Sequence, residues 1–277
     1  MSTSPTISFI GAGNMAGALI GGMLDNGYKA GDIWVSAPDD AHLQAIRKRF
    51  GVSITTDNRY CARQADLVIL AVKPQVMADV CRDIAPVVQN TRPLMVSIAA
   101  GLTADTLDQW LGGGLPMVRV MPNTPSLVGK GAAGLFANSH VKDDQKKMVQ
   151  AVFESIGSAL WVEDENLLHG VTALSGSGPA YFFLMLEALE AAATEAGIEP
   201  ATARELAIQT MAGAAEMAAR SEHDPARLKR NVMSPGGTTE QAIKTFEDGG
   251  LRELVKKAYG AAFRRSEEMA EELAGKQ

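Results

Sequence analysis

Short apolar runs of β type alternate with amphipathic helical stretches through the first 163 residues of the chain. The run from Leu67 to Val72 is apolar throughout instead of alternating between apolar and polar residues. A strand of this kind is covered on both faces, as in a parallel sheet with helices on each side. The sequence therefore predicts an α/β fold with a doubly wound parallel sheet. The expected strands are Ile7–Ile10, Ile33–Val35, Leu67–Val72, Leu94–Ile98, Val118–Val120 and Ala159–Val162.

The strand pattern stops after Glu163, and the rest of the chain has a helical pattern. Apolar residues recur there at helical spacing, as at Leu254, Ala258 and Ala261, and Gly-Pro, Glu-Pro and Asp-Pro pairs interrupt the stretch. Because proline ends or restarts helices, these pairs separate several helices. We therefore expect a nucleotide-fold domain over residues 1–164 and an all-α domain over residues 165–277.

Two of the expected helices are apolar on nearly every face. They cover residues 181–193 and 206–219, which are rich in alanine and large apolar side chains. Such helices must be buried all round, and a domain of about 110 residues hides about one of them within itself. We therefore predict that the helical part is a dimerisation domain. The expected assembly is a homodimer, or a larger oligomer, in which these helices pack across subunits.

Composition narrows the classes of partner. The formal net charge is −6, and lysine and arginine form no block, which argues against a nucleic-acid surface. No window holds the roughly 18 continuous apolar residues of a membrane span, and the N-terminus does not resemble a signal peptide. Cys61 and Cys81 form no CxxC and no Cys/His metal spacing. We expect a cytoplasmic protein that acts on a small molecule, with no metal, nucleic-acid or membrane partner.

The segment Ile10-Gly-Ala-Gly-Asn-Met-Ala-Gly17 follows the first expected strand and opens a helix that runs to about Asn26. Gly11 and Gly13 permit a tight turn and the close approach of a pyrophosphate to the helix N-terminus, while the later small residues permit close packing of helix and strand. A glycine turn alone is a weak signal. Its position at the first strand–helix junction favours a dinucleotide site over a structural turn.

The end of the second strand bears on the choice of dinucleotide. An NAD site usually has an acidic residue there to hold the ribose diol, but this strand ends Val35-Ser-Ala-Pro38. Asp39 and Asp40 lie just beyond and are expected to start the next helix. No arginine stands at the strand end. The sequence therefore favours NADPH and leaves NADH as an alternative.

The stretch Ala71-Val-Lys-Pro74 is expected to form the next wall of the cofactor groove, because ligands bind at the carboxyl ends of parallel strands. Lys73 either steers phosphates there or is an ordinary surface lysine. The sequence alone leaves both interpretations open.

Two glycines and three hydroxyl residues lie in the stretch Asn231-Val-Met-Ser-Pro-Gly-Gly-Thr-Thr-Glu240, where a helical region breaks and starts again. Gly236 and Gly237 let the backbone turn with exposed N–H groups, and Thr238 or Thr239 is expected to cap the following helix. A carboxylate or phosphate would meet aligned donors and the positive end of a helix dipole. The alternative is an ordinary capped turn.

A proton donor for a reduced carbonyl is missing where it is expected. Reduction of a carbonyl needs a side chain such as His, Lys or Tyr beside the nicotinamide. The stretch from Leu174 to Glu190 contains no Lys or His, and Tyr181 is more typical of a helix core than of a catalyst. An imine substrate explains the gap, because its nitrogen can arrive already protonated. The histidines are interpreted as structural residues: His42, His140, His169 and His223.

Taken together, these residues resemble the pyrroline-5-carboxylate reductase family over essentially the whole chain. The resemblance rests on 10–16, 71–74, Met121-Pro-Asn-Thr-Pro125, Leu174-Ser-Gly-Ser-Gly-Pro-Ala-Tyr181 and 231–239. It implies reduction of (S)-1-pyrroline-5-carboxylate to L-proline with NAD(P)H, the last step of proline biosynthesis. It also implies an N-terminal Rossmann-type domain, a helical domain that dimerises, and further assembly of five dimers into a decamer in some members.

The resemblance also implies site residues. Those expected at the cofactor wall are Ile10, Gly11, Ala12, Gly13, Asn14, Met15, Ser36, Asn58, Ala71, Val72, Lys73, Pro74, Ala99 and Ala100. Those expected at the substrate are Glu222, Asn231, Ser234, Gly236, Gly237, Thr238 and Thr239. Thr239 is expected nearest the ring nitrogen, as the catalytic residue, with Thr238 as the alternative. Where many relatives have a second Ser or an Arg after Ser36, this chain has Ala37, which leaves the degree of NADPH preference open.

Two other functions use similar features. A hydroxyacid dehydrogenase of the same two-domain plan needs a basic residue on the helix that starts near Pro179, and that residue is missing. A non-catalytic dinucleotide sensor would use the same glycine turn, with the helical domain serving assembly alone.

Overall fold

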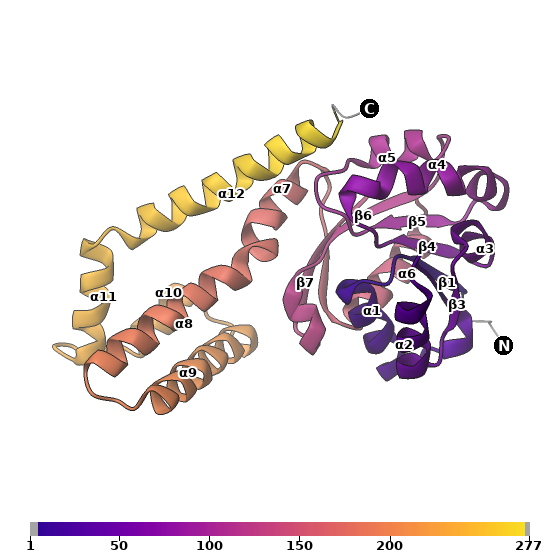
Figure 1. Ribbon diagram of the computed structural model, residues 1–277. Coiled ribbons are helices and arrows are strands. Elements are labelled where there is room, and N and C mark those ends of the chain that lie inside the picture. The colour runs from indigo at the N-terminus through magenta and orange to yellow at the C-terminus, as the bar shows by residue number, and fades with distance from the viewer. Residues whose placement is uncertain (1–4, 275–277) are drawn as a thin grey trace. The chain divides into compact units, whose positions relative to one another are not determined.

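The computed structural model describes residues 5–274 (Figure 1). Contacts between residues divide the chain into two compact units. Unit 1 contains the residues up to Ser177 together with those from Ala262 onward, and unit 2 contains Gly178–Ala261. The division at residue 164 stays a prediction of the sequence. Each unit is described by itself.

Unit 1 is built on one sheet with the strand order β3-β2-β1-β4-β5-β6-β7-β8. Neighbouring strands are parallel throughout except for β6 and β7, which are antiparallel. The strands are β1 (Ile7–Ile10), β2 (Ile33–Ser36), β3 (Ser53–Thr55), β4 (Leu67–Leu70), β5 (Leu94–Ser97), β6 (Met117–Met121), β7 (Gly131–Ala137) and β8 (Gly157–Trp161). The predicted doubly wound α/β sheet is confirmed, except that β7 and β8 run opposite to the other strands.

The central strands are buried on both faces. Every residue of β1, β4 and β5 is buried, and this explains why their sequences do not alternate between apolar and polar residues. The strand expected from Leu67 to Val72 ends at Leu70, because the chain turns there to start a helix at Pro74. The predicted strands are otherwise present within one or two residues of the expected ends.

Two strands have no counterpart among those expected from the sequence, namely β3 and β7. β3 has only three residues, and β7 consists mainly of glycine and alanine, which have low strand propensity. Packing explains the glycines of β7. A Cβ atom at Gly131 would lie 2.9 Å from the Ile156 carbonyl oxygen, and one at Gly134 would lie 2.7 Å from the Val171 side chain.

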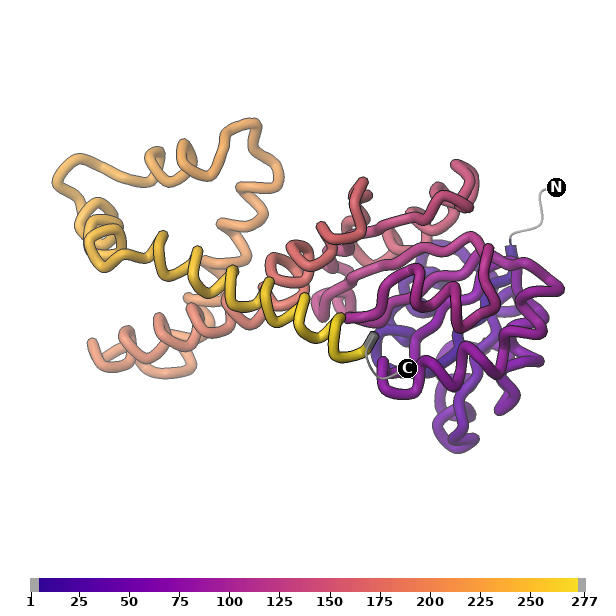
Figure 2. Tube along the Cα trace, turned by 90° about the horizontal axis from the view of Figure 1, so that it is seen from above, coloured from indigo at the N-terminus to yellow at the C-terminus, as the bar shows by residue number. Residues whose placement is uncertain are grey.

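Helices cover both faces of the sheet, as Figure 1 shows. Side chains of α1, α2 and α6 pack into one core, and those of α3, α4 and α5 pack into a second core on the opposite face. The helices of this unit are α1 (Asn14–Asp25), α2 (Asp40–Phe50), α3 (Asn58–Arg63), α4 (Pro74–Thr91), α5 (Ala104–Trp110), α6 (Asp143–Glu154) and α7 (Leu167–Val171). The path through these strand–helix units can also be followed in Figure 2.

Unit 2 is helical throughout. Its helices are α8 (Gly178–Glu195), α9 (Pro200–Arg220), α10 (Pro225–Asn231), α11 (Thr238–Asp248) and the first part of α12 (Leu251–Ala274). Arg204 of α9 pairs with Glu190 of α8 at 2.7 Å, which joins these two helices side by side. Glu199 caps α9 by accepting a hydrogen bond from Thr202 N. Among the described residues, no helix has both the length and the apolar character needed to cross a membrane.

Candidate active site

The glycine turn after β1 has the geometry expected of a phosphate-binding turn. Gly11 has φ +109°, and its N–H donates to the Ser36 carbonyl at 2.8 Å. A Cβ atom at Gly11 would lie 2.6 Å from the Ala71 carbonyl oxygen, so a larger residue does not fit. Gly13 is the N-cap of α1, and a Cβ atom there would meet nothing within 4 Å. The N-terminus of α1 is therefore open at Gly13 and has no side-chain cap.

The prediction that Gly17 permits close packing of the helix against the strand is wrong. A Cβ atom at Gly17 would meet nothing within 4 Å, so no close packing requires glycine there. The close contact on α1 is instead at Gly22, where a Cβ atom would lie 2.4 Å from Ile156 Cγ2. Ala16, which is 1% exposed, is the small residue of the turn that packs into the core.

His42 holds the glycine turn from the side, a role that the sequence did not reveal. Its Nε2 lies 2.6 Å from the Ala12 carbonyl oxygen. His42 stands in the first turn of α2, where its own N–H donates to Asp39 Oδ1 at 3.2 Å. Asp39 thereby caps α2, and the prediction that Asp39 and Asp40 start this helix is confirmed.

Two predicted cofactor residues meet at the end of β2. Ser36 is fully buried, and its Oγ donates to Asn58 Oδ1 at 2.8 Å. Asn58 is the first residue of α3. This bond uses the amide oxygen of Asn58 and directs its Nδ2 donors away from Ser36. The nearest acidic side chain along the chain, Asp39, is engaged in capping α2.

The segment after β4 forms a second helix N-terminus. Ala71 N donates to the Ile10 carbonyl at 2.8 Å, which ties the segment to the end of β1. Lys73 is the N-cap of α4 and is exposed, and Pro74 occupies the first helical position. Proline suits this position because its missing N–H would have no partner within the helix. Ile10, Ala71 and the glycine turn are thus brought together.

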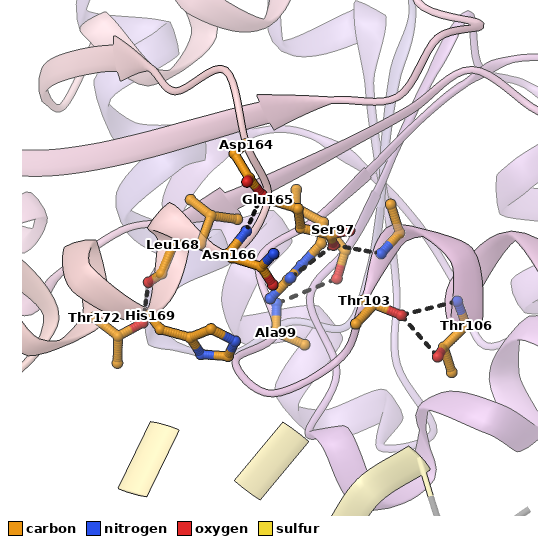
Figure 3. A network of polar contacts seen from close by, with 12 residues as sticks. Ser97, Ala99, Thr103, Thr106, Asp164, Glu165, Asn166, Leu168, His169 and Thr172 are labelled. Atoms are coloured by element: carbon orange, nitrogen blue, oxygen red, sulfur yellow. Dashed lines mark hydrogen bonds and ion pairs between the residues drawn. The ribbon is translucent and has the colours of Figure 1, made fainter. Parts of the chain in front are cut away.

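The segment after β5 carries Ala99 and Ala100, the last predicted residues of the cofactor wall. Ala99 N donates to Ser97 Oγ at 3.3 Å, and Ile98 N donates to the Leu70 carbonyl at 3.2 Å. Gly101 follows with φ +77°, and a Cβ atom there would lie 2.8 Å from Leu273 Cδ1 on α12. Figure 3 shows Ser97 and Ala99 within a network of polar contacts.

Glu165 belongs to the same network and was not singled out from the sequence (Figure 3). Its Oε1 accepts hydrogen bonds from Arg119 Nη1 at 2.7 Å and from Ala104 N at 2.6 Å. Arg119 lies on β6 and is 7% exposed. A basic residue inside an apolar strand is the signal that could have indicated such a buried partner.

In unit 2, the glycine loop leads from α10 into α11. Gly236 has φ +71°, and Gly237 N donates to the Ser234 carbonyl at 2.9 Å. The N-cap of α11 is Gly237, with no side-chain cap bond, so the prediction that Thr238 or Thr239 caps this helix is wrong. Instead, Glu240 Oε2 accepts a bond from Gly236 N at 2.7 Å. Both threonines lie in the first helical turn.

The other residues singled out from the sequence lie in different settings. Asn231 ends α10, and Glu222 lies between α9 and α10. Tyr181 lies on α8 and is 40% exposed in the single chain. His169 Nδ1 lies 2.9 Å from Ser266 Oγ on α12, which is the contact of a structural histidine.

The geometry of unit 1 is compatible with binding of a dinucleotide. The uncapped N-terminus of α1 offers N–H groups to a phosphate, and the open space at Gly13 leaves room for it. The neutral Ser36–Asn58 pair at the end of β2 does not repel a 2′-phosphate. These features agree with the predicted preference for NADPH.

Both ends of the chain match family profiles. Residues 6–101 match the profile described as NADP oxidoreductase, coenzyme F420-dependent, and residues 165–269 match the profile described as pyrroline-5-carboxylate reductase dimerisation. The fold, the glycine turn and these matches define the chain as an NAD(P)H-dependent oxidoreductase with a helical C-terminal part.

Relatives that match over nearly the whole chain identify the family. The chain is 46% identical to a pyrroline-5-carboxylate reductase of Pseudomonas aeruginosa over 273 residues, which is 99% of each chain. The solved structure of such a reductase from Coxiella burnetii matches with a TM-score of 0.94 and 44% identity, over 97% of this chain and 99% of that one. A Plasmodium falciparum reductase solved with NADP bound matches with a TM-score of 0.84 and 31% identity, over 96% and 98%. The chain belongs to the pyrroline-5-carboxylate reductase family.

Proposed function

We propose that this protein reduces (S)-1-pyrroline-5-carboxylate to L-proline with NADPH, the last step of proline biosynthesis. The observation that carries the proposal is the phosphate-binding turn at Gly11 and Gly13 in a chain that matches a reductase of this name over 99% of its length. The NADP-linked profile over residues 6–101 and the NADP-bound relative support NADPH as the cofactor. NADH is the alternative cofactor.

The cofactor is assigned to the residues around the glycine turn and the ends of β2, β4 and β5. The N–H groups at the start of α1 hold the pyrophosphate, and Asn58 with Ser36 lies at the adenosine ribose and its phosphate. Lys73 and Pro74 line the middle of the groove, and Ala99 and Ala100 line its far end. When bound, NADPH supplies the hydride that reduces the imine carbon.

The substrate carboxylate is assigned to the loop before α11. The uncapped first turn of this helix, with Thr238 and Thr239, provides N–H and hydroxyl donors at the positive end of the helix dipole. Charge-assisted hydrogen bonds contribute about 1.5–3 kcal/mol each, enough to fix the ring for hydride attack. Gly236 contributes its left-handed turn to this loop. Its N–H is not assigned to the substrate, because it donates to Glu240. Ser234, Gly237, Asn231 and Glu222 complete the proposed substrate site.

An imine substrate suits a site without a dedicated acid. The imine nitrogen carries its own proton, so reduction of the imine carbon leaves a neutral amine that takes a further proton from solvent. Thr239 holds the ring nitrogen by its hydroxyl, and Thr238 is the alternative. The products are proline and NADP⁺, with one hydride and one further proton consumed for each protonated imine.

We also propose that the protein is a homodimer formed through unit 2. The dimerisation profile over residues 165–269 supports it. So do the large apolar side chains that α8 and α9 leave exposed in the single chain: Phe182, Phe183, Leu184, Leu206, Ile208 and Met217. Burying such side chains in a partner is favourable by about 25 cal/mol for each Å² of apolar surface. Assembly of five dimers into a decamer and a location in the cytoplasm are further parts of the proposal.

The test is the loss of NADPH absorbance when pyrroline-5-carboxylate is added. Oxidation of NADPH supports the reductase, and cofactor binding without oxidation would favour the non-catalytic sensor. Thr239→Ala tests the assignment of the substrate loop: we expect kcat to fall by about 100-fold, the cost of one lost transition-state donor, with the Kd for NADPH unchanged. A wild-type kcat would remove Thr239 from the mechanism and leave Thr238 to be tested in the same way.

A further inference from the structure

We propose that Glu165 is a positioning residue that fixes the nicotinamide end of the cofactor groove. The inference rests on the cofactor part of the proposed function. Glu165 lies in the segment between β8 and α7, outside the residues assigned to the cofactor wall. It acts through the backbone of the segment from Ile98 to Ala104, which contains Ala99 and Ala100. Figure 3 labels Ala99 and Thr103 of this segment.

One carboxylate oxygen joins two other parts of the fold. Glu165 Oε1 lies 2.7 Å from Arg119 Nη1 on β6 and 2.6 Å from Ala104 N at the start of α5. The Arg119 side chain is 9% exposed and that of Glu165 is 21% exposed. A charge pair this far from solvent is weakly screened by salt, and its two hydrogen bonds restrict the carboxylate to one position.

The contact at Ala104 fixes the far end of the wall segment. The near end is held to the sheet by Ile98 N, which donates to the Leu70 carbonyl at 3.2 Å, and by the bond from Ala99 N to Ser97 Oγ. Between these ends lies Gly101, whose φ of +77° is a backbone conformation that favours glycine. Glu165 therefore helps to hold the chain where it leaves the segment, together with Thr103, which caps α5.

The strand order indicates which end of the cofactor this segment meets. β2, with Ser36 and its partner Asn58, lies on one side of β1, and β4 and β5 lie on the other side. In a doubly wound sheet the two halves of a dinucleotide lie on opposite sides of the crevice beside the glycine turn. With the adenosine at Ser36 and Asn58, the nicotinamide half lies toward the segment after β5.

Two ligands separate a local effect on the nicotinamide end from a general loss of structure. NADPH spans both ends of the groove, whereas 2′,5′-ADP has the adenosine and the 2′-phosphate but no nicotinamide. For Glu165→Ala we expect the Kd for NADPH to rise by about tenfold and the Kd for 2′,5′-ADP to stay within about twofold of wild type. Titration calorimetry on the full-length protein measures both. Unchanged NADPH affinity, or an equal loss for both ligands, would overturn the proposal.

Matched variants control for charge and folding. Glu163→Ala removes the same charge from an exposed position two residues away and should change neither Kd. Glu165→Gln keeps an acceptor oxygen for Ala104 N and should retain most of the affinity for NADPH. Because Glu165→Ala leaves Arg119 buried without its partner, the double variant Arg119→Leu/Glu165→Leu, which removes both charges, tests the same point in a fold without an unpaired ion. The double variant should also have a higher Kd for NADPH and an unchanged Kd for 2′,5′-ADP.

The ratio of the Kd for NADPH to the Kd for 2′,5′-ADP is measured without substrate, so it does not depend on the proposed reaction. If the wild-type protein binds both ligands but does not oxidise NADPH with pyrroline-5-carboxylate, the proposed reaction fails while the ratio of the two Kd values still tests Glu165. If the reaction proceeds and Glu165→Ala has wild-type affinity for NADPH, only the role of Glu165 is overturned.

Discussion

Ser36 Oγ donates to Asn58 Oδ1 at 2.8 Å and so joins the end of β2 to the first turn of α3. The two residues are 22 positions apart in the chain and lie on different elements. Both were expected at the adenosine end of the cofactor. Through this contact the buried Ser36 positions the neutral amide of Asn58 there, where an NAD enzyme usually has a carboxylate.

Replacing Ser36 by Asp should therefore shift the protein from NADPH toward NADH. A carboxylate beside Asn58 repels the 2′-phosphate and accepts hydrogen bonds from the ribose diol of NADH. The ratio of kcat/KM for NADPH to that for NADH should fall by about tenfold or more, which corresponds to about 1.4 kcal/mol. Ser36→Ala is the control, since it removes the bond to Asn58 without adding charge. An unchanged ratio in Ser36→Asp would contradict the assignment of the adenosine end.

The left-handed turn at Gly236 provides a test of the substrate loop with an internal control. Gly236 and Gly250 have φ of +71° and +76°, and a Cβ atom at either would meet nothing within 4 Å. Alanine in this conformation costs about 1 kcal/mol of stability at both positions. Only Gly236→Ala should raise the KM for pyrroline-5-carboxylate, by about tenfold, because only its turn leads into the first turn of α11. Equal KM values for the two variants would place the carboxylate elsewhere.

Two buried thiols predict a loss of stability at alkaline pH. Burial raises the pKa of Cys81 from 9.0 to about 12 and that of Cys61 from 9.0 to about 11. Above pH 9 the unfolded chain releases these protons while the folded chain keeps them, so the free energy of unfolding falls as the pH rises. The contribution is fully present below about pH 9 and is lost as the pH approaches the folded values.

Urea unfolding at a series of pH values between 7 and 11 measures this effect. A single thiol changes the slope by at most about 1.4 kcal/mol per pH unit. Cys81→Ala should be less stable than wild type at neutral pH, because it leaves a cavity, but should lose less stability between pH 9 and 11. Parallel curves for the two proteins would show that Cys81 ionises as easily in the folded chain as in the unfolded one.

The exposed apolar side chains of unit 2 predict a stable dimer. Phe183 on α8 is 65% exposed in the single chain, and Leu206 on α9 is 56% exposed. Sedimentation of the wild-type protein at low micromolar concentration should give a dimer or a larger species. Phe183→Glu should weaken the assembly, while Val128→Glu, at a 76% exposed site of unit 1, should not. A stable wild-type monomer would contradict the assignment of α8 and α9 to an interface.

The sequence predicted those parts of the fold that depend on local pattern. The apolar run at β4 indicated a strand covered on both faces, the glycines after β1 indicated the turn, and Asp39 indicated the start of α2. The strand β7 was missed because it consists mainly of glycine and alanine, and its glycines reflect close packing against Ser126 and Val171, which no local pattern reveals.

Contacts between distant segments also limited the prediction of the site. Glu165 and His42 contact residues that are 61 and 30 positions away, at Ala104 and Ala12, so neither role follows from a motif. The cap of α11 was misassigned for a different reason. Threonine is a common N-cap, but here Gly237 is the N-cap and Glu240 satisfies the N–H of Gly236 instead.

We propose that hydride passes from NADPH to the imine carbon of pyrroline-5-carboxylate. NADPH that carries deuterium at both C4 positions, incubated with the protein and substrate, tests it most directly by mass spectrometry of the product. We expect proline that is one mass unit heavier, with the label on the ring carbon that was the imine carbon. Consumption of NADPH without labelled proline, or no consumption in a protein that binds NADPH, would contradict it.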